Sequence, residues 1–132
     1  MSTKKQVVET ALCPQTLAVM PYAAAVKHNG MVYLSGNIGM DPNTRKLVEG
    51  DIKARTRMIM SIITNVLADS GTDIKNIIKC SEFLTDMADL ADMNEAYLGF
   101  FPDAKDIPAR TCVQVAGLPL GMDIEIECFA HL

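Results

Sequence analysis

The chain has 132 residues, 49% of them hydrophobic, and a formal net charge of -4 at pH 7. This length predicts one domain spanning residues 1–132, and the hydrophobic content excludes intrinsic disorder. The negative balance argues against a broad nucleic-acid-binding face, which requires clustered lysine and arginine. We find neither a membrane-length apolar run nor the apolar stretch of a signal peptide, so we expect a cytoplasmic protein without membrane contact.

The first half of the chain predicts one strand and one long helix. The stretch GMVYLSG, residues 30–36, is rich in β-branched and aromatic side chains and follows a turn signal at Asn29 and Gly30, which is typical of a strand. Residues 51–70 form a helix by their apolar spacing, with Asp51 as N-cap and Gly71 just past the C-terminus. The apolar positions of this helix are Ile52, Ile59, Ile62, Ile63 and Val66.

The second half predicts a strand at residues 77–84, an amphipathic helix at residues 89–101 and two final strands. The two final strands flank a break at Gly117, Pro119 and Gly121, so a simple hairpin is the default expectation. Along the last strand, acids alternate with apolar residues. Because alternate side chains point to opposite faces, one face carries three carboxylates that repel one another. These acids are Asp123, Glu125 and Glu127.

The order of these elements predicts an α+β domain in which two helices cover one face of a sheet with at least four strands. Nothing in the sequence supplies a second helical layer for the opposite face of the sheet. A second copy of the same chain can cover that face, so we expect a homo-oligomer.

Cysteine and histidine give no metal-binding pattern. The four cysteines lack the short spacing of zinc ligands, and only two histidines could add nitrogen ligands, so we expect no metal and no cofactor. Without a secretory signal, the thiols are expected to be free. The residues concerned are Cys13, Cys80, Cys112, Cys128, His28 and His131.

Five motifs occur in a characteristic order along the chain: PYAAAV, YLSGNIGMDP, NEAYLGFF, PARTCVQVAGLP and IEIE. In order and spacing, from about Val7 to Leu132, they resemble the RidA family, also called the YjgF or L-PSP family. The resemblance implies a chorismate-mutase-like fold, with a mixed sheet and two helices on one face, that assembles as a trimer. It places another strand between the two final ones, against the hairpin.

The resemblance also implies an activity and a set of site residues. The activity is hydrolysis of 2-iminobutanoate, 2-iminopropanoate and the corresponding enamines, released by pyridoxal-phosphate enzymes, to a 2-keto acid and ammonia. In the family the pocket lies between two subunits. Arg110 matches the carboxylate-binding arginine, and Glu125 matches the glutamate that holds the attacking water. Tyr22, Ser35, Gly36 and Cys112 match other pocket positions, whereas Asn94 is interpreted as structural.

The residue types agree with this chemistry. Arginine holds a substrate carboxylate through two parallel charge-assisted hydrogen bonds. An iminium carbon is already electrophilic, so the reaction needs only an oriented water and a carboxylate such as Glu125 to take its proton. No histidine lies near Cys112 in the sequence, so we interpret that thiol as pocket wall or as a redox-sensitive bystander, and not as a nucleophile.

Two other functions remain open. Family members have also been named endoribonucleases or translation inhibitors, although the acidic balance and the lack of paired histidines weigh against RNA cleavage here. A non-catalytic trimer that binds small carboxylates or client proteins is the other alternative. The chain also departs from the family pattern at four residues and in the loop 97–108, which bears on pocket shape and substrate size. The four residues are Met20, Ala24, Arg55 and Ile62.

Overall fold

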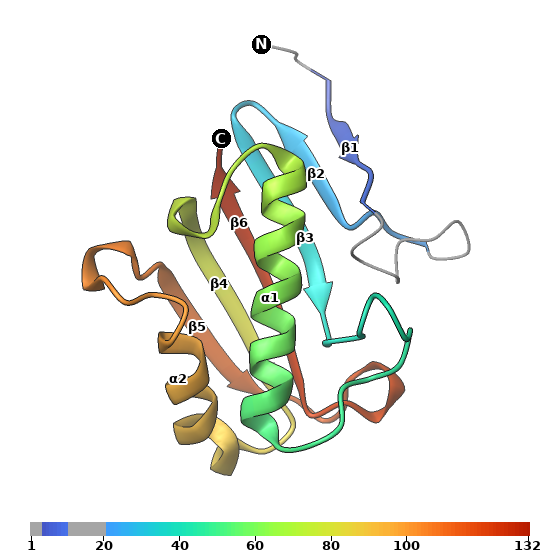
Figure 1. The fold of residues 1–132 in the computed structure, drawn as a ribbon, viewed down its shortest axis with the longest axis vertical. Coiled ribbons are helices and arrows are strands. Elements are labelled where there is room, and N and C mark those ends of the chain that lie inside the picture. Colours follow the sequence, from blue (N-terminus) through green and yellow to red (C-terminus); the bar gives the residue numbers. More distant parts are fainter. Residues whose placement is uncertain (1–3, 11–20) are drawn as a thin grey trace.

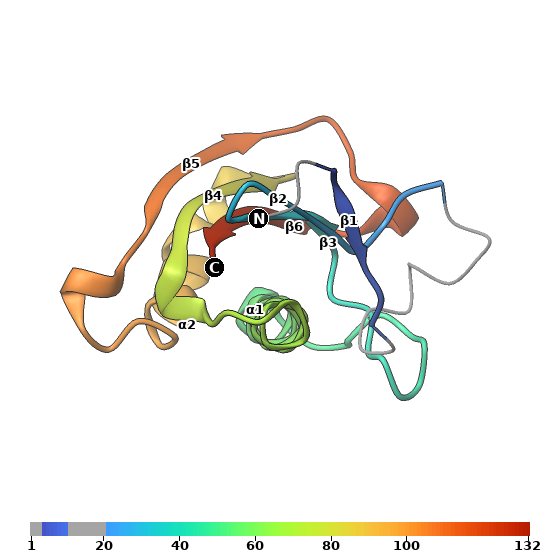
Figure 2. The ribbon, with the colours of Figure 1, turned by 90° about the horizontal axis from the view of Figure 1, so that it is seen from above.

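The computed structural model describes residues 4–10 and 21–132, so that Cys13 and Met20 lie outside the described residues. Six strands form one mixed sheet in the order β1-β2-β3-β6-β4-β5. Helices α1 and α2 pack on the same face of this sheet (Figures 1 and 2). The predicted α+β architecture is therefore confirmed. The elements are β1 (Gln6–Val8), β2 (Ala25–His28), β3 (Met31–Asn37), α1 (Ile52–Ser70), β4 (Ile77–Leu84), α2 (Leu90–Leu98), β5 (Ala109–Gln114) and β6 (Ile124–His131).

The core lies between the helices and the sheet. Ile59 and Ile63 of α1 are fully buried, as are Val32 of β3 and Ile126 of β6. The opposite face of the sheet carries exposed aromatic side chains, because Tyr33 of β3 and Phe129 of β6 lie in register on neighbouring strands. Their ring centroids are 5.9 Å apart. Within the described residues, this second face has no helical cover.

Helix α1 has the ends that its sequence predicts. The Asp51 carboxylate accepts a hydrogen bond from the backbone N–H of Ala54 at 2.9 Å, which satisfies one free donor of the first turn. Gly71 ends the helix in the left-handed region, at φ +92°. Helix α2 is shorter than the predicted 89–101, and the chain leaves it after Leu98, so that Phe101 packs into the core from a turn.

The expected hairpin between the two final strands is wrong. Strand β4 lies between them and pairs in parallel with β5 and antiparallel with β6. The parallel β4–β5 pair needs a crossover, which α2 provides, and residues 115–123 then carry the chain past β4 to its other side. The arrangement implied by the family resemblance is the correct one.

The acids of the last strand meet different partners. The guanidinium of Arg55 on α1 donates two hydrogen bonds to the Asp123 carboxylate, at 2.7 Å from Nε and 2.5 Å from Nη2. This two-point ion pair ties the start of α1 to the start of β6 and removes one charge from the repelling series. Glu125 is half-buried and Glu127 is exposed.

One acid, Glu82, lies inside the core. It stands in the middle of β4, on the helix-covered face, and is 0% exposed. Loss of hydration raises the pKa of Glu82 to about 7, although the nearby positive charge of Arg110 acts to lower it. The folded protein therefore holds a proton on Glu82 at a pH at which an exposed glutamate would be ionised.

Glu82 is expected to make folding stability depend on pH. An ordinary glutamate has a pKa of 4.5, so the folded state binds this proton more tightly than the unfolded chain does. The stability from the bound proton is fully present below pH 4.5 and is lost as pH rises through about 7, an effect of about 3 kcal/mol. Urea unfolding of wild type and Glu82→Gln across this range measures it.

The readout is the difference in unfolding free energy between the two proteins. This difference should shift in favour of Glu82→Gln as pH rises from 4.5 to 8, because glutamine does not titrate. The variant Glu82→Leu also lacks a titrating group and should show the same trend. A difference that is constant across the range would show that Glu82 titrates alike in the folded and unfolded states.

Candidate active site

Arg110 stands on the edge strand β5 and is held by side chains from two other elements. Its Nη1 donates a hydrogen bond to Oδ1 of Asn94 on α2 at 2.5 Å, and its guanidinium carbon lies 5.5 Å from the ring centroid of Tyr97. The same Nη1 lies 3.6 Å from Oε2 of Glu82 on β4. A hydrogen bond, a cation–π contact and an ion pair together fix the guanidinium.

The guanidinium borders a hollow of about 320 Å³. We call this hollow the arginine half-site; its lining residues are Asn94, Tyr97, Leu98, Ile107 and Arg110. Among the described residues Arg110 makes a single hydrogen bond, so most of its five N–H donors stay available to a ligand. The arginine half-site can therefore bind an anion.

Glu125 lies in a second hollow, of about 210 Å³, on the face of the sheet that the helices leave uncovered. We call it the glutamate half-site; its lining residues are Tyr22, Ser35, Gly36, Pro119 and Glu125. Burial, with a smaller contribution from the charge of Glu127, raises the pKa of Glu125. A carboxylate with a raised pKa is a better proton acceptor than an exposed one.

Backbone geometry holds the glutamate half-site together. A Cβ atom at Gly36 would lie 2.7 Å from Cδ of Glu125, so the absence of a side chain at Gly36 lets Glu125 lie against β3. The hydroxyl of Ser35 donates to the carbonyl of Ala23 at 2.6 Å, and the Ser35 N–H donates to the carbonyl of Ala24 at 3.0 Å. These bonds fix the segment beside Tyr22.

The two half-sites lie on opposite faces of the sheet. Arg110 pairs in register with Cys80, which is buried beneath the helices, whereas Glu125 pairs with Phe83. Because side chains alternate along β4, Cys80 and Phe83 point to opposite faces. The structure thus brings together Tyr22, Ser35, Gly36 and Glu125, but separates them from Arg110 within one chain.

Cys112 follows Arg110 by two residues on β5 and belongs to the side of the arginine half-site. It pairs in register with Glu82 and is partly buried. Burial raises the pKa of the Cys112 thiol, and the charge of Glu82 adds to this effect. The thiol therefore stays protonated and is a poor nucleophile, in line with the sequence-based interpretation.

Asn94 of the arginine half-site and Glu82, the buried neighbour of Arg110, were not predicted as site residues from the sequence. Asn94 was interpreted as structural, but its amide oxygen accepts a hydrogen bond from Arg110. Its position three residues before Tyr97 on a helix, which puts both on one face, is the signal that could have found it. Glu82 had a signal too, since a glutamate in the strand IIKCSEFL falls on the alternation of the buried residues.

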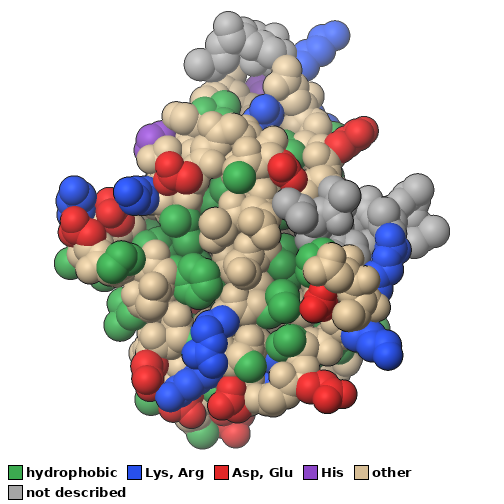
Figure 3. Space-filling view, in the orientation of Figure 1, with side chains coloured by type: hydrophobic (Ala, Val, Ile, Leu, Met, Phe, Trp, Pro, Cys, Tyr) green, Lys and Arg blue, Asp and Glu red, His purple; other side chains and the backbone are tan. Residues whose placement is uncertain are grey.

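The described residues contain no group of three or more histidine, cysteine, aspartate or glutamate side chains that could hold a metal ion. No helix in the same part of the chain is long and apolar enough to cross a membrane. Basic and acidic side chains are interspersed on the helix-covered face, where Figure 3 shows no continuous basic area.

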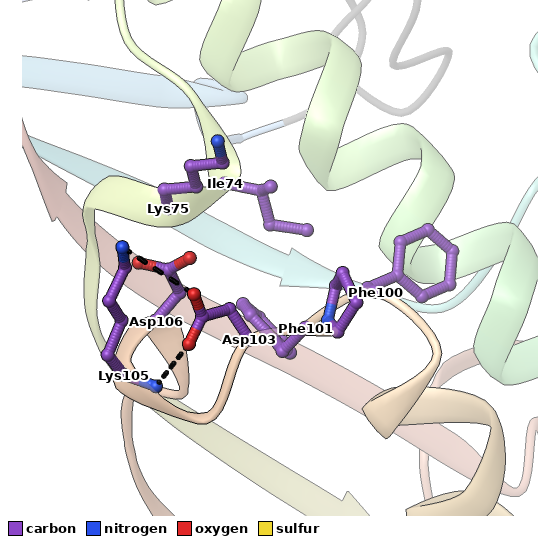
Figure 4. Close-up of a pocket in the computed structure, with 8 residues that line it drawn as sticks. Ile74, Lys75, Phe100, Phe101, Asp103, Lys105 and Asp106 are labelled. Atoms are coloured by element: carbon purple, nitrogen blue, oxygen red, sulfur yellow. Dashed lines mark hydrogen bonds and ion pairs between the residues drawn. The ribbon is translucent and has the colours of Figure 1, made fainter.

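Another hollow, of about 300 Å³, lies between the segment after α2 and the residues before β4 (Figure 4). Phe100 and Phe101 contribute its apolar part. Asp103 pairs with Lys105 at its edge, where Nζ and Oδ2 are 3.5 Å apart. None of the predicted site residues lines this hollow.

Comparison with known proteins places these features in a family. The family model described as "Endoribonuclease L-PSP" matches residues 13–132. The chain is 40% identical to Reactive Intermediate Deaminase A, chloroplastic, of Arabidopsis thaliana, over 99% of this chain and 68% of that protein. It is 34% identical to 2-iminobutanoate/2-iminopropanoate deaminase of Mus musculus, over 96% of this chain and 90% of that protein.

The fold also matches a solved structure. E. coli TdcF with bound serine matches the fold with a TM-score of 0.87 and 33% sequence identity, covering 96% of this chain and 98% of that chain. The match thus extends over nearly the whole domain, including the strands that carry both half-sites. The chain belongs to the RidA family, also called the YjgF or L-PSP family.

Proposed function

We propose that this protein is a 2-iminobutanoate/2-iminopropanoate deaminase, which hydrolyses imines and enamines released by pyridoxal-phosphate enzymes. The observation that carries the proposal is the pair of half-sites: a fixed guanidinium with free donors and a half-buried carboxylate with a raised pKa. Relatives named as deaminases, and a neighbour that binds the small carboxylate serine, support the same substrate class.

In the proposed reaction Arg110 binds the carboxylate of a 2-imino acid through two N–H groups. Glu125 takes a proton from a water molecule, and the water oxygen forms a bond to the imine carbon. The π electrons of the C=N bond move to nitrogen, which takes up a proton. The resulting carbinolamine loses ammonia and leaves the 2-keto acid. The net reaction consumes one water and requires neither an oxidant nor a covalent nucleophile.

The proposed site needs two subunits. Arg110 and Glu125 lie on opposite faces of one sheet, so the arginine half-site of one chain must meet the glutamate half-site of another. The uncovered face offers a surface for this contact, because Tyr33 is 47% exposed and Val113 on the edge strand is 43% exposed. A homotrimer, as the family resemblance implies, would form three such sites.

The endoribonuclease alternative is less well supported. The net charge is -4, and charges of both signs are interspersed on the face shown in Figure 3. The two histidines, His28 and His131, stand on β2 and β6 with Met31 of β3 between them in register. They are therefore not adjacent strand partners, and neither lines either half-site.

The role of Glu125 separates an enzyme from a binding protein. Glu125→Gln keeps the shape of the side chain but removes the proton acceptor, so turnover of 2-iminobutanoate should fall by about 10²–10⁴-fold. Binding of 2-oxobutanoate, measured by calorimetry, should change little. The assay couples the protein to threonine dehydratase and follows decay of the imine.

Glu127→Gln is the matched control, because Glu127 stands two residues along the same face but is exposed. It should retain most of the turnover. Full turnover in both variants would show that the acids on this face are only structural. Loss of binding in Glu125→Gln would assign Glu125 to substrate recognition and not to the proton transfer.

Mixed assemblies test the contribution of two chains. Arg110→Lys keeps the charge but loses the planar two-point contact, so this variant alone should be nearly inactive. Trimers reassembled from equal amounts of Arg110→Lys and Glu125→Gln should regain activity, because about a quarter of the interfaces would pair an intact arginine with an intact glutamate. Light scattering measures whether the reassembled particles have the mass of a trimer.

A mixture that stays inactive although mixed trimers form would place both residues in the same chain's site. A monomer at micromolar concentration would exclude the intersubunit site altogether. Mixing either variant with itself under the same refolding conditions controls for recovery of activity by refolding alone.

A further inference from the structure

The proposed reaction does not involve the buried carboxylate of Glu82. Both of its oxygens lack a hydrogen-bond partner among the described residues, and the side chain is 0% exposed. The nearest cation is Arg110, whose Nη1 lies 3.6 Å from Oε2, beyond ordinary hydrogen-bond distance. A buried acid that has one long ion pair and no hydrogen bond is costly, so its presence beside the candidate anion-binding residue points to a functional reason.

Arg110 can face two anions at once. Its side chain is 28% exposed and borders the arginine half-site, while its other neighbour is the fully buried Glu82. A ligand carboxylate bound at Arg110 would therefore share one guanidinium with Glu82. Two carboxylates at one cation repel each other, and the more buried one gains most from taking up a proton.

The other titratable groups around Glu82 come from β4, β5, β6 and α2. Burial raises the pKa of Tyr97 on α2 and of Cys112 on β5, so both stay neutral near pH 7. Cys80 on β4 differs, because a hydrogen bond shared with Cys128 on β6 lowers the pKa of its thiol. Cys80 must therefore be tested beside Glu82. The hydrogen bond with Cys80, together with burial, raises the pKa of Cys128, so this thiol also stays neutral near pH 7.

The other neighbours within the described part of the chain are apolar. The register partner of Glu82 on β6 is the apolar Ile126, and the buried side chains of α1 in this part of the core, such as Ile59 and Ile63, are also apolar. Arg110 is the single charged group among the described residues that forms an ion pair with Glu82. Any charge change at Arg110 thus acts directly on this acid.

We propose that Glu82 is a proton-accepting counter-ion of Arg110, so that a small carboxylate binds Arg110 together with one proton that moves from solvent to Glu82. This inference rests on the proposed carboxylate-binding role of Arg110. Glu82 acts through the arginine and is a positioning residue. The net charge of the buried group is then the same before and after binding: the ligand brings one negative charge and the proton removes one. The arrangement selects small monoanionic acids and favours their release as pH rises.

The affinity for 2-oxobutanoate should depend on pH with a definite sign. The pKa of Glu82 in the free protein is about 7, and ligand binding raises it further. Below pH 7 the acid is already protonated, so affinity is highest and independent of this proton. Above pH 7 the dissociation constant should rise by up to about tenfold per pH unit until the pKa of the complex is passed.

Calorimetry counts the proton directly. Titration of 2-oxobutanoate at pH 7.5 in buffers of different ionisation enthalpy should give uptake of up to about three quarters of a proton per site in wild type, because about a quarter of the Glu82 side chains are already protonated at that pH. Glu82→Gln should abolish the uptake and flatten the pH dependence, with an affinity near that of wild type at pH 6. Cys80→Ser should retain the uptake. If the Glu82→Gln variant does not fold, Glu82→Leu is used in its place.

The outcomes separate this inference from the proposed function. Binding without proton uptake in wild type, or uptake that persists in Glu82→Gln, would overturn the role of Glu82 and leave the deaminase proposal standing. Proton-coupled binding without turnover of 2-iminobutanoate would overturn the deaminase proposal and leave the role of Glu82 standing. Absence of binding by 2-oxobutanoate would overturn both. Weaker binding of Glu82→Gln at every pH, by the same factor, would make Glu82 merely structural.

Discussion

The place of β4 between β5 and β6 determines where every candidate functional group lies. It gives Arg110 a buried neighbour, Glu82, and sets α2 as the crossover that brings Asn94 and Tyr97 against the guanidinium. The same placement puts Glu125 one strand further on, facing the other side. A site that uses both Arg110 and Glu125 must therefore be built from two chains. Contact between chains over the uncovered sheet face would then both bury its apolar side chains and complete the site.

The sequence correctly predicted the elements that are determined by interactions between residues close together in the chain. Helix α1 has an apolar stripe, an N-cap and a terminal glycine, and all three work as expected. Strands β1 and β2 were not predicted, since they have only three and four residues and are too short to show alternation. The wrong hairpin has a related cause: a glycine- and proline-rich break marks a turn, but pairing partners are chosen by the whole sheet.

The identities of the site residues came from the family motifs, whereas their partners came from the structure. Arg55 and Asp123 are separated by 68 positions, and nothing in the sequence pairs them. Arg55 was noted as a departure from the family pattern, and its two-point contact with Asp123 now gives a physical reason for it. Asn94 was interpreted as structural, whereas its 2.5 Å hydrogen bond to Arg110 and its place in the lining of the arginine half-site link it to the site.

The repulsion among the three acids of the last strand is reduced because each lies in a different environment. Asp123 is neutralised by Arg55, Glu127 remains exposed, and Glu125 is half-buried against Gly36, where burial raises its pKa. Burial acts more strongly on Glu82, whose one ion-pair partner among the described residues is the arginine that would bind substrate. In the proposed chemistry both acids take up protons, one from the attacking water and one from solvent. In both cases the fold partly or fully removes the carboxylate from water, which raises its pKa, and places it beside a group whose charge changes during binding or reaction.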